Sequence, residues 1–186
     1  MRATTEARLL DAAEELFFSR GIAATPVDAV LARAGASAAT LYRGYPTKEA
    51  LVAAALDRRH RDWVATWDAC VERQPDDEGR LLAVFDALDA FRSGPRGARW
   101  CAFLGAAAEH ADESAEVAAA VRTDTETLRS RLTALAEPVV GPDAAALAEE
   151  LLLVVSGDLA MRLRDPGHGT ALAREVARAL VARRRA

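Results

Sequence analysis

The sequence predicts an all-α chain of about nine helices. Apolar residues recur at three- and four-residue steps along most of the chain, which is the spacing of one helix face. The breaks between these runs are short and contain glycine or proline, as helix ends do. With 186 residues, 51% of them hydrophobic, the chain can bury a substantial core. We expect two domains, one of three short helices over residues 1–48 and one of longer helices over residues 49–186.

The first expected helix covers residues 5–19. Its apolar face carries Leu9, Ala13, Leu16 and Phe17. The glycine at position 21 then ends the helix, since glycine adopts the left-handed conformation of a helix end without strain.

A second helix is expected over residues 26–34. Thr25 offers a hydroxyl N-cap, and Pro26 suits the first helical position, where no N–H group is needed. Gly35 suits the left-handed position that ends the helix. The turn that follows is therefore tight.

A third short helix is expected over residues 38–43. Ser37 supplies its N-cap, and Gly44 and Pro46 stop it. The alanines at its start would let the backbone approach a groove closely.

Thr47 then caps a helix that begins at Lys48, the only lysine among 24 Lys and Arg residues. The free N–H groups and the dipole at such a start favour an anion, and a phosphate fits. Two short helices, a glycine turn and a capped basic helix are typical of a DNA-binding helix-turn-helix. We therefore expect residues 25–48 to bind DNA.

The segment Arg8–Leu56 resembles the DNA-binding domain of the TetR (tetracycline repressor) family of transcriptional regulators. Residues 100–112, WCAFLGAAAEHAD, are similar to a segment found in many members, and the rest of the chain resembles the family in length and helical content. The landmarks that carry the resemblance are Ala12-Ala13, Leu16-Phe17, Gly21, Thr25, Val30, Ala34-Gly35, Thr40-Leu41-Tyr42, Lys48-Glu49 and Leu51.

The resemblance implies that the helix from Ser37 to Tyr42 enters the major groove of operator DNA. Two positions depart from the family pattern. Gly44 stands where many members have histidine, which removes one phosphate contact, and Tyr45 stands where phenylalanine is commonest, which keeps an aromatic core residue and adds a hydroxyl. The expected DNA-binding residues are Thr25, Ser37, Ala38, Ala39, Thr40, Tyr42, Arg43, Tyr45 and Lys48.

A long helix over residues 47–72 is expected to join the two domains, followed by helices over 80–91, 98–111, 114–137 and 143–164 and a last one from about residue 172. Most of the large aromatic residues fall in this second part. They suggest an apolar cavity for a small organic effector, although a place in the core is the commoner role for each one alone. The expected lining is Trp63, Trp67, Phe85, Trp100, Phe103, Leu104 and His110.

The last two helices have the pattern of a dimer interface. Each carries an apolar stripe, and small residues such as Gly157 would allow close packing in a four-helix bundle across a two-fold axis. The alternative is a core within one chain. The expected interface residues are Leu147, Leu151, Val154, Val155, Leu172, Val176 and Leu180.

Composition limits the function classes. The net charge is -4, and residues 1–48 carry six basic and five acidic groups, so DNA binding would depend on local placement of charge rather than on a strongly basic domain. Residues 1–10 lack the apolar run of a signal peptide, and we expect a cytoplasmic protein. Cys70 and Cys101 are too few for a disulfide framework. We expect no metal and no cofactor.

An enzyme is not expected, because the three histidines are far apart and neither a catalytic constellation nor a glycine-rich phosphate loop is present. The sequence favours a homodimeric transcriptional regulator that a small organic effector releases from a palindromic operator. The role of repressor follows from the family resemblance alone. The alternative is a helical protein-interaction module whose degenerate helix-turn-helix no longer binds DNA.

Overall fold

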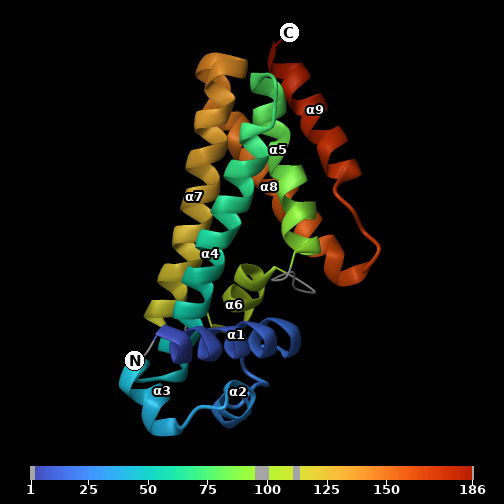
Figure 1. Cartoon of the computed structure of the whole chain (residues 1–186). Helices are drawn as coiled ribbons and strands as arrows, with labels where there is room; N and C mark the ends of the chain where they lie inside the picture. Colours follow the sequence, from blue (N-terminus) through green and yellow to red (C-terminus); the bar gives the residue numbers. More distant parts are fainter. Residues whose placement is uncertain (1–2, 95–100, 111–113, 186) are drawn as a thin grey trace. The chain divides into compact units, whose positions relative to one another are not determined.

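The computed structural model describes residues 3–94, 101–110 and 114–185. Over these ranges the chain forms nine α-helices and one 3-10 helix and contains no strand, so the all-α prediction is confirmed (Figure 1). The elements are α1 (Ala3–Arg20), α2 (Val27–Ala34), α3 (Ala38–Gly44), α4 (Lys48–Glu72), α5 (Asp77–Ser93), α6 (Ala102–His110), α7 (Ala115–Val140), η1 (Gly141–Asp143), α8 (Ala144–Arg164) and α9 (Ala171–Arg185).

The helix ends that the sequence marks most clearly are present. Gly35 closes α2 with φ 59° and ψ 42°, the left-handed conformation that glycine adopts most easily. The Ser37 hydroxyl accepts a hydrogen bond from the Thr40 N–H at 3.3 Å and caps α3. The Thr47 hydroxyl accepts one from the Ala50 N–H at 3.0 Å at the start of α4.

Several helix starts differ from the prediction: α1 begins at Ala3 rather than at residue 5, and α6 at Ala102 rather than at residue 98. Two further differences concern the caps. Thr25 is not the N-cap of α2, because Pro26 occupies that position and the helix begins at Val27. α5 begins at Asp77 rather than at residue 80, because the Asp76 carboxylate accepts a hydrogen bond from the Gly79 N–H at 2.7 Å and caps the helix. Asp76, Asp77 and Glu78 lie outside the helix that the sequence predicted. In the structure Asp76 caps α5 and the other two form its first turn, where negative charge is favourable.

The chain divides into two compact units. Unit 1 comprises Met1–His60 and Ala98–Thr123, and unit 2 comprises Arg61–Gly97 and Asp124–Ala186. Helices α4 and α7 each run from one unit into the other. A compact unit and a functional domain can end at different residues, so the division into a DNA-binding domain before residue 49 and a second domain after it stays a prediction.

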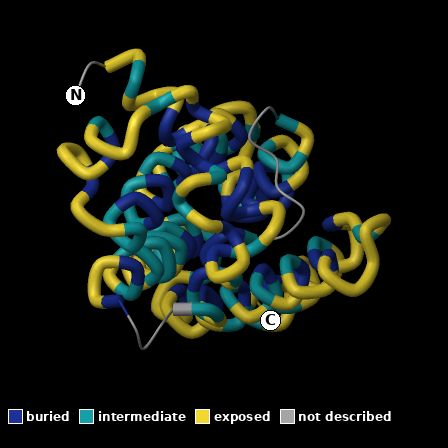
Figure 2. The backbone as a smooth tube through the Cα atoms, turned by 90° about the horizontal axis from the view of Figure 1, so that it is seen from below, coloured by how far each residue is buried: buried dark blue, intermediate teal, exposed yellow. Residues whose placement is uncertain are grey.

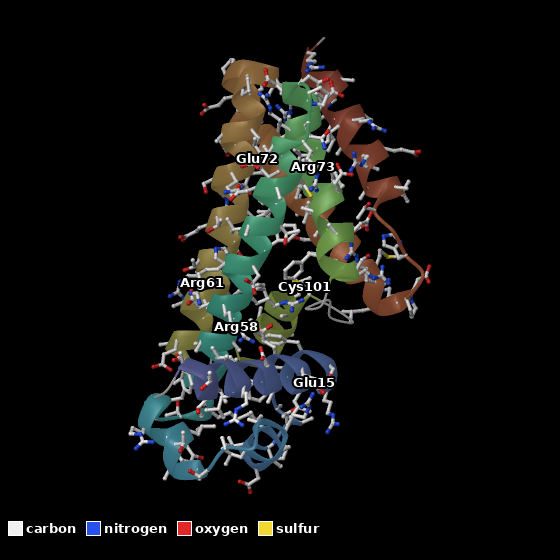
Figure 3. All side chains as sticks on the ribbon, viewed as in Figure 1. Glu15, Arg58, Arg61, Glu72, Arg73 and Cys101 are labelled. Atoms are coloured by element: carbon white, nitrogen blue, oxygen red, sulfur yellow. The ribbon has the colours of Figure 1, made fainter. Side chains whose placement is uncertain are left out.

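The core of unit 1 is built around α1. The predicted apolar face of this helix is buried, and Ile22, Val30, Leu41 and Leu51 pack in the same cluster. Ala102, Phe103 and Ala106 from α6 belong to this cluster as well. The Arg58 guanidinium of α4 lies beside α1, with its Nε 2.5 Å from Glu14 Oε1 and Nη2 2.9 Å from Asp11 Oδ1 (Figure 3). Helix α6 is thus part of the same compact unit as the three N-terminal helices.

The core of unit 2 gathers residues from α4, α5, α7, α8 and α9. Its largest fully buried side chains include Trp67, Phe85, Leu132, Leu147 and Leu151. None of the described helices is both long enough and apolar enough to span a lipid bilayer.

Candidate nucleic-acid interface

Helix α3 presents most of its residues to solvent. Leu41 is its buried residue, while Ala38, Ala39 and Arg43 are exposed and Tyr42 is 49% exposed. Among the described residues Arg43 has no ion-pair partner, which leaves its guanidinium free for a phosphate or a base edge. Two alanines at the start of the helix leave its backbone accessible. These features suit a short helix that lies against a groove of DNA.

Ser37 and Thr40 form a local hydroxyl pair at the start of α3. Their side-chain oxygens lie 2.9 Å apart, and Ser37 also caps the helix. Ser37 is exposed and Thr40 is half-buried. One hydroxyl of the pair donates to the other, so one O–H group at this exposed end of the helix stays available to donate to a phosphate oxygen.

Lys48 begins α4 as the sequence predicts. Its Nζ lies 5.8 Å from the centre of the Phe17 ring, and the residue is half-buried. A cation over an aromatic face is held in place without being neutralised. The charge of Lys48 therefore adds to the positive end of the α4 dipole.

Thr25 and Tyr45 do not lie on this surface, and their predicted side-chain contacts with DNA find no support. Thr25 is 1% exposed, and its hydroxyl donates to the Gly21 carbonyl at 2.7 Å and to the Leu16 carbonyl at 3.3 Å. Tyr45 is 8% exposed, and its hydroxyl donates to Glu6 Oε1 at 3.2 Å. Burial, together with the charge of Glu6, raises the pKa of Tyr45 to about 12. Both residues hold the domain together.

Arg8 is a surface residue that the sequence reasoning missed. It is exposed on α1, and its Nη1 lies 3.9 Å from the point that a Cβ on Gly35 would occupy. A guanidinium beside the turn between α2 and α3 is placed for a phosphate contact. The spacing along α1 could have indicated this residue only if the position of the turn had been known.

Five of the seven side chains expected to line an effector cavity are described, and they divide between the two units. Trp63 packs against Trp67 and Phe91, with ring centres 5.7 Å and 5.8 Å away. Trp67 and Phe85 are fully buried in the core of unit 2. Phe103 belongs to the core of unit 1, Leu104 is 38% exposed, and both Trp100 and the side chain of His110 lie outside the described residues.

An open pocket of about 520 Å³ lies elsewhere in unit 2. Its lining comes from the face of α4 that carries small and polar residues and from the end of α5, namely Asp62, Ala65, Thr66, Ala69, Arg73, Ala90, Phe91 and Gly94. The hydrophobic pattern could not reveal this pocket, because the aromatics of α4 lie on a different face of the helix.

The expected dimer residues separate into two groups. Leu147, Leu151 and Val155 are buried in the core of unit 2, so they are not free to form an interface. Leu172 and Val176 are 63% and 43% exposed, while Val154 and Leu180 are half-buried. Figure 2 shows exposed and buried stretches alternating along the C-terminal helix, as expected for a helix with one covered face.

The sequence reasoning missed three exposed apolar residues on α8, of which Leu163 is 55% exposed. Leu153 is 74% exposed and Met161 is 41% exposed. They lie eight residues apart and so share a helix face. Among the described residues, no three His, Cys, Asp or Glu side chains are placed to hold a metal ion.

Residues 9–55 match the family model described as "Bacterial regulatory proteins, tetR family". No curated protein matches the chain. The chain is similar to the solved structure of SCO4454, a TetR-family transcriptional regulator from Streptomyces coelicolor, with 28% identity, 98% of this chain and 96% of that chain covered, and a TM-score of 0.88.

Two further structures share the fold at lower identity. The protein sav143 from Streptomyces avermitilis is 24% identical, with 97% of this chain and 98% of that chain covered and a TM-score of 0.83. A TetR transcriptional regulator from Chloroflexus aurantiacus is 22% identical, with 98% and 96% covered and a TM-score of 0.78. The chain therefore carries the helix-turn-helix DNA-binding domain of the TetR family and has the fold of TetR-family transcriptional regulators.

Proposed function

We propose that this chain is a repressor that binds a palindromic operator as a homodimer and leaves it when a small organic effector binds. The observation that carries the proposal is the exposed surface of α3. Two alanines, Tyr42 and the free Arg43 lie on it, and the next helix along the chain starts with a capped turn and Lys48.

The chemistry of this surface divides into two tasks. Lys48 and the N–H groups at the start of α4 would bind phosphate and fix the position of the domain on the duplex. The exposed residues of α3 would read the bases, with Arg43 able to bind guanine and the alanine methyl groups able to contact thymine. The set of predicted contacts that this proposal retains is Ser37, Ala38, Ala39, Thr40, Tyr42, Arg43 and Lys48.

A homodimer would present two such surfaces to a two-fold symmetric site. The exposed side chains of Leu153, Met161, Leu172 and Val176 support this part of the proposal. Apolar side chains on adjacent helices gain free energy when a second copy covers them. Helices α8 and α9 are both in unit 2 and contact each other, so the four residues belong to one helix pair.

The pocket of unit 2 would receive the effector. Its volume of about 520 Å³ is of the order that small-molecule sites need. Phe91 and the alanines offer apolar contact, and Asp62 and Arg73 offer charges of both signs, so an organic molecule with a polar group fits best. Helix α4 carries Lys48 at one end and the pocket residues Asp62 to Ala69 in its second half, and Arg73 follows directly after its last residue. A shift of this helix would change the spacing of the two reading surfaces and weaken operator binding.

Such a regulator has no catalytic role, and it acts in the cytoplasm, where the chromosome is. The rival proposal is a protein-interaction module that no longer binds DNA. It does not explain why Arg43 is exposed without an ion-pair partner among the described residues, or why the start of α4 is capped beside Lys48.

The proposal is tested by selecting binding sites from random-sequence duplex DNA with the purified protein. A recovered palindrome that also lies beside the protein's own gene would support it. Enrichment of no sequence, with the protein folded, would refute the DNA-binding function. A thermal-shift screen of small organic molecules would follow, in which a hit must also lower operator affinity and lose its effect when Arg73 is changed to alanine.

A further inference from the structure

We propose that Glu109 of α6 is a positioning residue for DNA binding, because its carboxylate holds the turn between α1 and α2 that sets the helix-turn-helix. This inference rests on the proposed DNA-binding function. Glu109 lies outside the segment that matches the family model, residues 9–55. The turn and α6 both belong to unit 1.

The two carboxylate oxygens of Glu109 each accept one backbone hydrogen bond. The Ile22 N–H donates to Oε1 at 3.2 Å, and the Ala23 N–H donates to Oε2 at 2.6 Å. Hydrogen bonds to an ionised acceptor are stronger than those between neutral groups. A half-exposed glutamate that made no specific contact would instead point both oxygens into water.

The turn has the geometry of an anion-binding concavity. Gly21 has φ +97°, and the next two N–H groups point toward the same carboxylate. Successive N–H groups beside a left-handed residue commonly hold an anion in this way. A Cβ on Gly21 would lie 3.3 Å from Glu109 Oε1, so glycine is also what allows the carboxylate to come this close.

Neither the Ile22 N–H nor the Ala23 N–H bonds to another backbone group among the described residues. Ile22 is 1% exposed and lies against the core, whereas Ala23 is exposed, so the cost of a lost partner falls on the Ile22 N–H group. A backbone N–H group that loses its partner near a core is costly. Glu109 therefore supplies a hydrogen-bond acceptor that the backbone of the N-terminal helices does not provide.

Helix α6 holds Glu109 on a fixed support. Its residues Ala102, Phe103 and Ala106 are buried in the core of unit 1. The Phe103 ring packs edge-on against His60, with 6.2 Å between ring centres. The carboxylate thus reaches the turn from an element that is packed in place, across 86 and 87 residues of sequence.

The turn between α1 and α2 also positions the helices that would read DNA. At its far end the buried Thr25 hydroxyl bonds to the Gly21 carbonyl at 2.7 Å, which closes the segment on itself. α2 begins two residues later and leads through Gly35 into α3. A change at the Glu109 end would therefore tilt α2 and α3 relative to α1.

The test compares Glu109→Gln with the wild type and with the control Glu116→Gln. Glutamine keeps the size of the side chain but has one acceptor oxygen and no charge. Glu116 is an exposed glutamate in the first turn of α7, also in unit 1. For each protein we would record the backbone amide NMR signals, the melting temperature and the affinity for a DNA site selected with the wild type.

We expect Glu109→Gln to shift the amide signals of Ile22 and Ala23 and to lower DNA affinity roughly tenfold, within the range of coupling between protein sites. Glu116→Gln should leave both unchanged. The affinity is measured well below the melting temperature, so a variant that is merely less stable would bind as the wild type does.

Two results would overturn the inference. Unmoved Ile22 and Ala23 signals would mean that the carboxylate does not hold the turn, and moved signals with unchanged affinity would mean that the turn does not position the reading helices. If the wild type binds no selected DNA, the proposed function fails and the positioning role fails with it. The amide signals would still decide separately whether Glu109 holds the turn.

Discussion

Replacing Thr25 with valine should lower the free energy of unfolding by about 1–2 kcal/mol, because a hydrogen bond to a buried carbonyl is lost. The Thr25 hydroxyl donates to the Gly21 carbonyl at 2.7 Å, and the residue is 1% exposed. Valine has almost the same shape, so no cavity forms. The net value of such a bond is about 0.5–1.5 kcal/mol, and the Gly21 carbonyl left facing a methyl group adds to the loss.

Urea unfolding followed by circular dichroism measures this change, with the slope of the transition expected to stay constant. Thr133→Val is the matched control. Its hydroxyl also donates to a backbone carbonyl, that of Arg129 at 2.9 Å, but Thr133 is only half-buried and this hydrogen bond is exposed. Such back-bonds contribute little, so the control should change stability by less than about 0.5 kcal/mol. Equal effects of the two changes, or no effect of Thr25→Val, would refute the structural role of Thr25.

Three further predictions follow from particular contacts. The pKa of Tyr45 is raised from 10.0 to about 12, so the contribution of Tyr45 to the free energy of unfolding should be fully present below pH 10 and be lost as the pH rises toward 12. Tyr45→Phe should remove about 1–2 kcal/mol of that loss in urea unfolding, after allowance for solvent screening of the hydroxyl. Arg58→Met should lower stability by about 1.5–3 kcal/mol in the same assay, because it removes a guanidinium whose Nε lies 2.5 Å from the buried Glu14 carboxylate; an unchanged midpoint would contradict this. Leu172→Lys with Val176→Lys should raise the dimer dissociation constant at least ~100-fold in sedimentation equilibrium, and an undisturbed dimer would place the interface elsewhere.

Local signals explain why the sequence predicts the helix-turn-helix well. Each of these helix ends depends on residues within four positions of one another, so a short segment of sequence determines its geometry. This holds for the caps at Ser37 and Thr47 and for the left-handed Gly35. The same local logic failed at Thr25. Its hydroxyl donates to the Gly21 carbonyl, which precedes it in the chain, instead of capping α2. A cap pattern in the sequence cannot show which of these two hydrogen bonds forms.

The face of α8 was harder to predict because the run at residues 151–155 is apolar all round. Leu151 and Val155 face the core while Leu153 is 74% exposed, and nothing in an unbroken apolar run distinguishes these directions. The pocket of unit 2 was missed for the opposite reason, because alanines and polar residues line most of it.

Contacts between residues far apart in the chain could not be predicted from the sequence. Glu109 meets Ile22 and Ala23 across more than eighty residues, and an isolated glutamate at the end of a short helix has no pattern that indicates such a partner. The family resemblance did not indicate it either, because the similarity of residues 100–112 does not say which residues this segment contacts.

The central claim is that the exposed surface of α3 and the start of α4 bind operator DNA. Fluorescence anisotropy with a selected DNA site, at two salt concentrations, tests it on the wild type, on Tyr42→Phe with Lys48→Ala, and on the control Arg164→Ala, which removes an exposed charge in unit 2. The double variant should lose about 1–3 kcal/mol of binding free energy and show a salt slope smaller by about one, with unchanged helicity. If instead the double variant binds as tightly as the control does, DNA is held by another surface and the account is wrong.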